Sequence, residues 1–198
     1  MATRDDLFLS ISIRISEISS RWKIYNQLFN NGEENLALLN SSGSYVFFLL
    51  QRLLLDDTIL ALSRLTDLPS SERKGKTKNA SIKYLIQIAR PTLSPVDCTY
   101  VDESMLKLGA HVKNMRHHRI KAIAHADLLH SVGSKELPDI RYSDLEDAMQ
   151  ELENIMLKLG TRDACRAGNY NQPIIAFGTD GNTLLVRLGR AKNIETEA

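Results

Sequence analysis

The stretch from Met115 to Asp127, M-R-H-H-R-I-K-A-I-A-H-A-D, gathers side chains that carry charge and move protons. All five histidines of the chain fall within twenty residues around it, from His111 to His130. No carboxylate lies between Glu103 and Asp127. Imidazoles change charge near neutral pH, and a group of cations without acids attracts phosphate. This composition indicates proton-transfer chemistry beside a fixed positive charge.

Arg119 supplies the fixed charge. If residues 104–129 form one α-helix, Arg119 falls on its core-facing stripe, where an apolar residue is expected. A guanidinium stays charged and is costly to bury alone, so it should meet a carboxylate, a phosphate or a water-filled cleft. The other members of the stripe are Leu108, Val112, Met115, Ala122, Ala126 and Leu129.

His118 and His125 share a neighbouring stripe with Lys107 and His111, because seven residues are nearly two helical turns. Successive side chains on this stripe lie about 10 Å apart along the axis, too far for one metal ion to bind two of them. No Ser or Cys stands in a context that would activate it as a nucleophile. We therefore expect neither a metal site nor a cofactor.

The pair of Arg119 and His125 suits cleavage of RNA by the ribose 2′-hydroxyl. That reaction needs a proton carrier with a pKa of about 6.5 and a cation that stabilises charge on the phosphoryl oxygens. On a straight helix the two side chains are about 120° apart, and a two-fold axis would bring two of each into one cleft. The sequence therefore predicts a homodimer whose contact includes residues 111–129. An inward arginine can equally hold a buried ion pair, and the helix can bind RNA without cutting it.

The spacing of Arg119 and His125, with five residues between them and A-H-A-D at the end, resembles the Arg-(four to six residues)-His signature of the HEPN superfamily. The wording R-I-K-A-I-A-H-A-D is most similar to the abortive-infection U-type branch. Two upstream stretches, Leu54–Asp57 and Ser63–Asp67, share this similarity, and the resemblance spans roughly Trp22–Asp127.

The resemblance implies an all-α, HEPN-like antiparallel helical bundle. It also implies a metal-independent endoribonuclease of toxin or phage-defence type, assembled as a homodimer, with RNA as substrate and an antitoxin protein as a candidate partner. Ile120 stands where the family usually has Asn or another polar residue. A non-catalytic RNA- or nucleotide-binding or protein-interaction module is therefore the alternative. Arg119 and His125 are the expected catalytic residues, and the expected binding residues are Arg116, His118, Lys121, Asp127 and Asp57.

The composition of the chain limits its size class, its charge and its cellular location. With 198 residues, 43% of them hydrophobic, and a net charge of +1, the chain is about one domain in size, and any attraction for nucleic acid must be local. We expect a bundle over residues 1–160 and an extension over 161–198. Cys98 and Cys165 have no metal-site spacing, and the apolar run 45–55 is too short to span a bilayer. These features predict a cytoplasmic protein without a membrane partner.

Hydrophobic periodicity predicts the helices that position the motif. A long helix covers 5–29 and a short one 33–40, followed by a possible kink at 41–44. An apolar helix over 45–67 should lie at the centre of the bundle or in a dimer interface. Shorter helices are expected at 81–89 and 144–159. The inward residues of the first helix are Leu7, Ile11, Ile15, Ile18, Trp22, Tyr25 and Phe29, and those of the last are Leu145, Met149, Leu152, Ile155 or Met156, and Leu159.

Three segments leave alternatives. Asp56 and Asp57 interrupt the apolar helix, and either they face solvent and pair locally or one of them contacts Arg119 or Arg64. The basic loop 68–79 is either solvated or tracks a phosphate backbone. In the tail, 173–177 is strand-like, 179–182 is a turn, and 184–188 is a return strand or a short helix.

Overall fold

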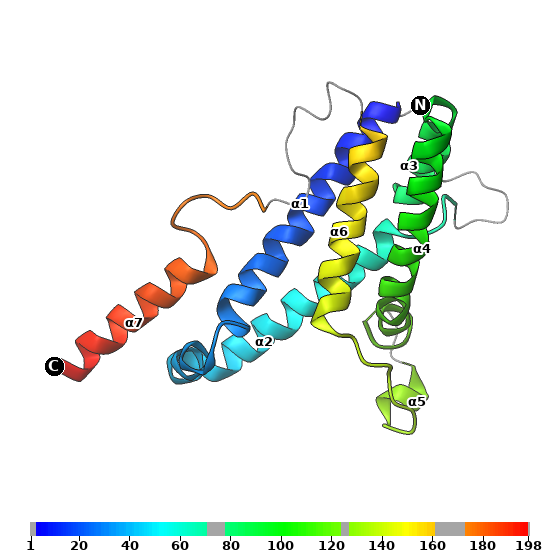
Figure 1. Cartoon of the computed structure of the whole chain (residues 1–198). Helices are drawn as coiled ribbons and strands as arrows, with labels where there is room; N and C mark the ends of the chain where they lie inside the picture. Colours follow the sequence, from blue (N-terminus) through cyan, green and yellow to red (C-terminus); the bar gives the residue numbers. More distant parts are fainter. Residues whose placement is uncertain (1–2, 71–77, 124–126, 161–172, 198) are drawn as a thin grey trace. The chain divides into compact units, whose positions relative to one another are not determined.

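The computed structural model describes residues 3–70, 78–123, 127–160 and 173–197, and within these ranges it is all-α, as the sequence predicts (Figure 1). The chain divides into two compact units. The first contains residues 1–16 and 59–172, and the second contains 17–58 and 173–198. The elements are α1 (Arg4–Phe29), α2 (Glu33–Leu65), α3 (Ile82–Ala89), the 3₁₀ turn η1 (Arg90–Thr92), α4 (Pro95–His118), the π-helix η2 (Arg119–Ile123), α5 (Leu128–Ser131), α6 (Tyr142–Leu159) and α7 (Gly181–Glu197).

The core of the first unit is built where α4 and α6 pack along each other, with α3 also against α6 (Figure 1). Burial of apolar side chains is the main force that holds such a pair together. The predicted inward face of α6 is confirmed, because all of its residues are buried: Leu145, Met149, Leu152, Ile155, Met156 and Leu159.

Capping contacts fix where the helices of the first unit begin. Ser81 accepts a hydrogen bond from the Tyr84 backbone N–H at 3.4 Å, which starts α3 at Ile82. Helix α6 begins at Tyr142, two residues before the predicted start. There the Asp144 carboxylate accepts from the backbone and the guanidinium of Arg141, and these hydrogen bonds hold the pKa of Asp144 below its usual range.

The first two helices follow the sequence closely. All seven predicted inward residues of α1 are at most 9% exposed. The segments 33–40 and 45–65 join into α2 across a kink at Gly43, where φ is 151° and ψ is 64°. A backbone with positive φ favours glycine, so this residue explains the break that the sequence placed at 41–44.

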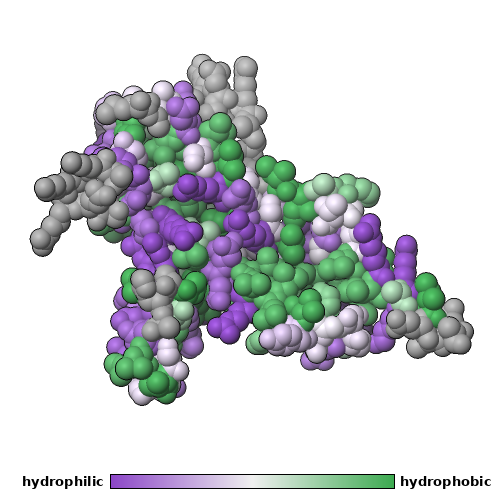
Figure 2. Space-filling model, turned by 180° about the vertical axis from the view of Figure 1, so that it is seen from behind, coloured by the Kyte–Doolittle hydropathy of each residue, from purple (hydrophilic) through white to green (hydrophobic). Residues whose placement is uncertain are grey.

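One stretch of α2, in the second unit, carries large apolar side chains on its surface. The prediction that this helix lies at the centre of a bundle is wrong for this stretch, while the interface alternative stays a prediction. The view from behind in Figure 2 shows a broad apolar area over this helix. The exposed side chains, between 41% and 71% accessible, are Tyr45, Val46, Phe48, Leu49 and Leu53.

The tail of the chain belongs to the second unit and ends in α7 rather than in a hairpin. The strand predicted for 173–177 is wrong, and of the two alternatives for 184–188 the helix is correct. The amide of Gln27 anchors the start of α7, because it accepts from the Gly181 N–H at 2.9 Å and donates to Asp180 at 2.9 Å. A Cβ on Gly181 would lie 2.9 Å from the Gln27 Cβ, so this approach requires glycine.

Candidate functional site

The motif helix changes geometry at the arginine. The predicted single helix over 104–129 is wrong, because α4 ends at His118 and the π-helix η2 takes over at Arg119. The predicted stripe is buried through Met115, but Ala122 and Leu129 are exposed and Ala126 lies outside the described residues.

The backbone at Arg119 marks the end of α4. Its N–H donates to the carbonyls of both Met115 and Arg116, a shared hydrogen bond that is common at helix ends, and the wider π-turn begins at this residue. Single π-turns of this kind occur frequently at functional sites. The separation of about 120° between Arg119 and His125 assumed a straight α-helix and no longer applies beyond residue 119.

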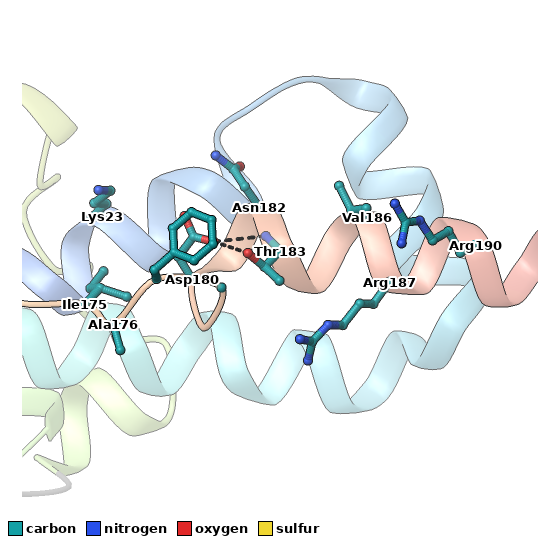
Figure 3. A pocket seen from close by; sticks show the side chains of 11 residues that line it. Lys23, Ile175, Ala176, Asp180, Asn182, Thr183, Val186, Arg187 and Arg190 are labelled. Atoms are coloured by element: carbon teal, nitrogen blue, oxygen red, sulfur yellow. Dashed lines mark hydrogen bonds between the residues drawn. The ribbon is translucent and has the colours of Figure 1, made fainter.

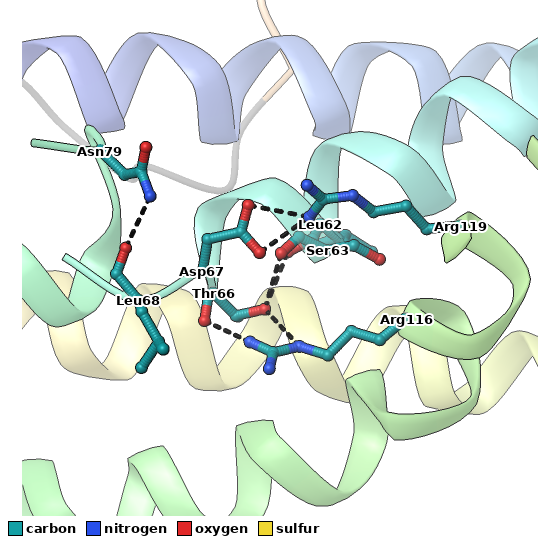
Figure 4. Close-up of polar contacts among 8 residues, drawn as sticks. All are labelled: Leu62, Ser63, Thr66, Asp67, Leu68, Asn79, Arg116 and Arg119. Atoms are coloured by element: carbon teal, nitrogen blue, oxygen red, sulfur yellow. Dashed lines mark hydrogen bonds and ion pairs between the residues drawn. The ribbon is translucent and has the colours of Figure 1, made fainter. Parts of the chain in front are cut away.

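Arg119 contacts a carboxylate at the end of α2. Its Nη1 lies 2.8 Å from both carboxylate oxygens of Asp67, and the two side chains are 26% and 31% exposed (Figure 4). The prediction of a partly buried Arg119 near an acid is confirmed. The acid is Asp67 rather than Asp56 or Asp57. Within the described residues, Nε and Nη2 make no hydrogen bond, so this edge of the guanidinium stays available to a ligand.

Arg116 reaches the same helix end from one turn earlier. Its Nε lies 3.2 Å from the Thr66 hydroxyl, and its Nη2 donates to the Thr66 carbonyl (Figure 4). The last carbonyls of a helix carry partial negative charge and lack partners in the helix, so a cation there is stabilising. Arg116 therefore secures the end of α2 and contributes positive charge beside Arg119.

Lys83 on α3 adds a third cation to this cluster. Burial lowers its pKa most, the nearby Arg116 lowers it further, and Asp67 acts in the opposite direction. The contacts at the end of α2 thus gather two guanidiniums, those of Arg116 and Arg119, against the one carboxylate of Asp67, and Lys83 is near enough for the charges of Arg116 and Asp67 to change its pKa. An excess of positive charge of this kind favours an anion such as phosphate.

Three members of this site are not among the residues predicted from the sequence: Lys83, Thr66 and Asp67. Lys83 sits in a segment that carries no motif, so only the folded structure reveals it. Asp67 closes the stretch Ser63–Asp67, which resembles the family, and this resemblance was the available signal.

Lys121 and Asp127, two predicted binding residues, bind each other. The Lys121 Nζ lies 2.7 Å from Asp127 Oδ2, and the Asp127 N–H donates to the Lys121 carbonyl at 3.1 Å. These two hydrogen bonds join Lys121 to Asp127, the residues on either side of 122–126. His125 lies outside the described residues, so its predicted catalytic role stays a prediction.

The predicted row of histidines does not converge on one point among the described residues. His118 Nε2 lies 2.6 Å from the Pro138 carbonyl; since a carbonyl only accepts, that nitrogen carries the proton. His111 lies 3.7 Å from Asp144 and 3.8 Å from Asp147. Among the residues that the structure describes, no group of three or more His, Cys, Asp or Glu side chains could hold a metal ion.

Asp57, the remaining predicted binding residue, pairs with Arg21 at 2.9 Å in the second unit. Most of the basic loop 68–79 falls in 71–77, outside the described residues. None of the described helices is long and apolar enough to cross a membrane.

The comparisons with known proteins give one match. No curated protein and no solved structure matches the chain. The family model HEPN_AbiU2, described as AbiU2, matches residues 4–162, which include the motif and every element from α1 to α6. With Arg119, Asp67 and the helices that hold them inside this match, the chain belongs to the abortive-infection family HEPN_AbiU2.

Proposed function

We propose that this protein is a metal-independent endoribonuclease of toxin or phage-defence type. The observation that carries the proposal is Arg119, whose guanidinium is oriented by Asp67, lies beside Arg116, and keeps Nε and Nη2 free of hydrogen bonds within the described residues. His125 follows six positions later, at the spacing of the HEPN signature that the sequence resembles. RNA is the proposed substrate.

The proposed reaction needs only these two side chains and the substrate. The ribose 2′-oxygen attacks phosphorus, the bond to the leaving 5′-oxygen breaks, and a 2′,3′-cyclic phosphate remains. His125 moves the proton from the 2′-hydroxyl and returns one to the 5′-oxygen. The Nε and Nη2 edges of Arg119 bind the phosphoryl oxygens, whose negative charge grows in the transition state.

The decisive experiment incubates the purified protein with total RNA and transfer RNA in excess chelator. We expect fragments that end in 2′,3′-cyclic phosphate. An Ile120→Asn variant belongs beside wild type, because the Ile120 side chain is 55% exposed and offers no hydrogen bond at the position where the family is usually polar.

The second candidate is a module that binds RNA without cutting it. It is favoured by the same contact, since an arginine already paired with Asp67 and followed by Ile120 also fits a structural role. If wild type and Ile120→Asn leave every RNA intact yet bind RNA with salt-dependent affinity, the ribonuclease proposal fails. Cleavage in excess chelator by wild type but not by His125→Ala excludes the binding-only alternative.

Asp67 is proposed as a positioning residue. Asp67→Ala should lower kcat for RNA cleavage by up to about 100-fold, because a misplaced charge stabilises the transition state poorly. Asp67→Asn should lose less, since its amide oxygen still accepts a hydrogen bond from Arg119. Asp56→Ala is the matched control, because it removes a carboxylate of α2 that faces Arg52, and it should leave kcat unchanged. An unaltered or raised kcat in Asp67→Ala would show that the ion pair restrains Arg119 instead.

A homodimer is proposed through the surface at the end of the motif. Four large apolar side chains are exposed there in the first unit, between 55% and 74%, although water disfavours such a cluster. A second copy would cover them and bring two motifs together, as the isologous contact of a two-fold dimer requires. An antitoxin protein is a further proposed partner for exposed apolar surface of this kind. The four side chains are Ile120, Leu128, Leu129 and Val132.

Light scattering at tens of micromolar should give the mass of a dimer for wild type. Leu129→Asp should shift the mass to that of a monomer, because a charge would be buried in the contact. Leu157→Asp, on an exposed site of α6, is the control and should remain dimeric. A wild-type monomer under these conditions contradicts the proposal.

A further inference from the structure

A pocket in the second unit brings cations and an aromatic ring together. It measures about 620 Å³ and is lined by Lys23 of α1, by the segment before α7, and by the first turns of α7. Pockets that hold small ligands have volumes of this order. The basic residues in its lining are Lys23, Arg187 and Arg190, and Phe177 also lines it.

Arg187 and Arg190 are the cations best placed to bind a ligand. Three residues on a helix rise about 5 Å, so their side chains extend from α7 within one turn of each other, and Figure 3 shows the Arg187 guanidinium on one side of the helix and the Arg190 guanidinium on the other. Neither guanidinium makes a hydrogen bond or an ion pair within the described part of the chain. Both side chains are long and rotatable, so the two free guanidiniums can turn toward one anion at the pocket.

The acid in this lining is already committed to the protein. Asp180 accepts from the Thr183 N–H at 3.0 Å, from the Thr183 hydroxyl at 2.7 Å and from Gln27 at 2.9 Å. The Thr183 hydrogen bonds hold the pKa of Asp180 below its usual range, and Lys23 lowers it further. Asp180 thus caps α7 and leaves the two arginines unneutralised. The charged lining residues are Lys23, Arg187, Arg190 and Asp180, with a net charge of +2.

Phe177 lies in a hydrogen-bonded turn that leaves its side chain exposed to solvent. The Thr179 N–H donates to the Ala176 carbonyl at 3.2 Å, and Gly178 has a φ of 73°. These are the features of a type II turn, which places Phe177 at its second position. The Phe177 side chain is fully exposed, at 106%. A ring presented in this way offers a flat face beside the cations.

We propose that this pocket binds one nucleotide of a single-stranded RNA. Arg187 and Arg190 hold a phosphate through their planar forks, Lys23 adds charge at the edge of the pocket, and the base stacks on Phe177. Stacking on an aromatic ring does not distinguish one base from another, so the site would accept any base. The inference shares its ligand class with the proposed function but requires no cleavage.

The test measures binding of a fluorescent, short 2′-O-methyl oligouridylate to the whole chain. This probe has no free 2′-hydroxyl and cannot be cut. The variant with both Arg187→Ala and Arg190→Ala should bind at least about 10-fold more weakly, and the slope of log affinity against log salt should fall by about 1 for the lost phosphate contact. Phe177→Ala should weaken binding about 5- to 100-fold. Alanine is a strong helix former, so α7 is retained in the arginine variants.

Lys192→Ala is the matched control, because it removes a positive charge from α7 outside the pocket lining. Wild-type affinity in the double arginine variant, or an equal loss in Lys192→Ala, overturns the proposal. Competition with uridine monophosphate separates the two sources of a nucleotide. If uridine monophosphate displaces the oligouridylate probe at equal concentration, the pocket binds free nucleotides rather than single-stranded RNA, and the proposal is overturned. Retained binding without RNA cleavage would overturn only the proposed function.

Discussion

His125→Ala and Arg119→Ala are each expected to slow RNA cleavage by roughly 10²–10⁴, the usual worth of a positioned acid–base group or of a charge that stabilises the transition state. Arg119→Lys should recover little of the loss, because an ammonium cannot contact Asp67 and a phosphate with one planar fork. Initial rates in excess chelator measure these effects. In His125→Ala, the dependence of the rate on pH between about 5 and 8 should also disappear.

The control for His125 is another histidine of the same region. His111→Ala removes an imidazole that faces Asp144 and Asp147, away from the Arg119 cluster, and should keep the rate within a few-fold of wild type. If His125→Ala and Arg119→Ala act on one step, the double variant should lose little more than either single one. A fully active His125→Ala protein contradicts the proposed mechanism.

Leu152→Ala is expected to lower the free energy of unfolding by about 2–5 kcal/mol. Leu152 is 0% exposed on α6, the helix that packs along α4, so truncation removes buried methyl groups and leaves a cavity. Leu157→Ala, on the same helix with its side chain 51% exposed, should change that free energy by less than about 0.5 kcal/mol. Urea unfolding followed by circular dichroism measures both.

An equal, small effect of the two leucine variants would mean that the α4–α6 contact does not hold this unit together. The result matters for the site as well, because α4 carries Arg116 and leads directly into Arg119. A variant that loosens this contact should therefore lose RNA cleavage together with stability.

The sequence predicts the long amphipathic helices well, because the period of about 3.6 residues marks the buried face directly. The inward residues of α1 and α6 are correct for this reason. The burial of the apolar helix 45–67 is harder to predict from the sequence. The side chains of a helix that is apolar on most sides are expected to be buried, but periodicity does not say whether other helices of the same chain or a second protein molecule bury them. The exposure of Tyr45 and Val46 could therefore not be predicted.

The site itself could be predicted only in part. The arginine, its partial burial and its need for an acid follow from one residue at an apolar position. The identity of the acid does not, because Asp56, Asp57 and Asp67 are equivalent until the chain folds. The π-turn was equally hidden, since it accompanies the contacts of Arg116 and Arg119 with the end of α2. The strand prediction for 173–177 is wrong because β-branched and aromatic residues form a strand only where a partner strand exists.

The close approach at Gly181 offers a marker for comparative work. A Cβ there would meet the Gln27 Cβ at 2.9 Å and the Leu28 Cγ at 3.1 Å, so every other amino acid would push the start of α7 away from α1. Helix α7 lies beyond residues 4–162, which define the family match. Among members of the family, a glycine at this position together with glutamine at position 27 should therefore distinguish chains that carry a docked α7 from chains that have diverged after α6.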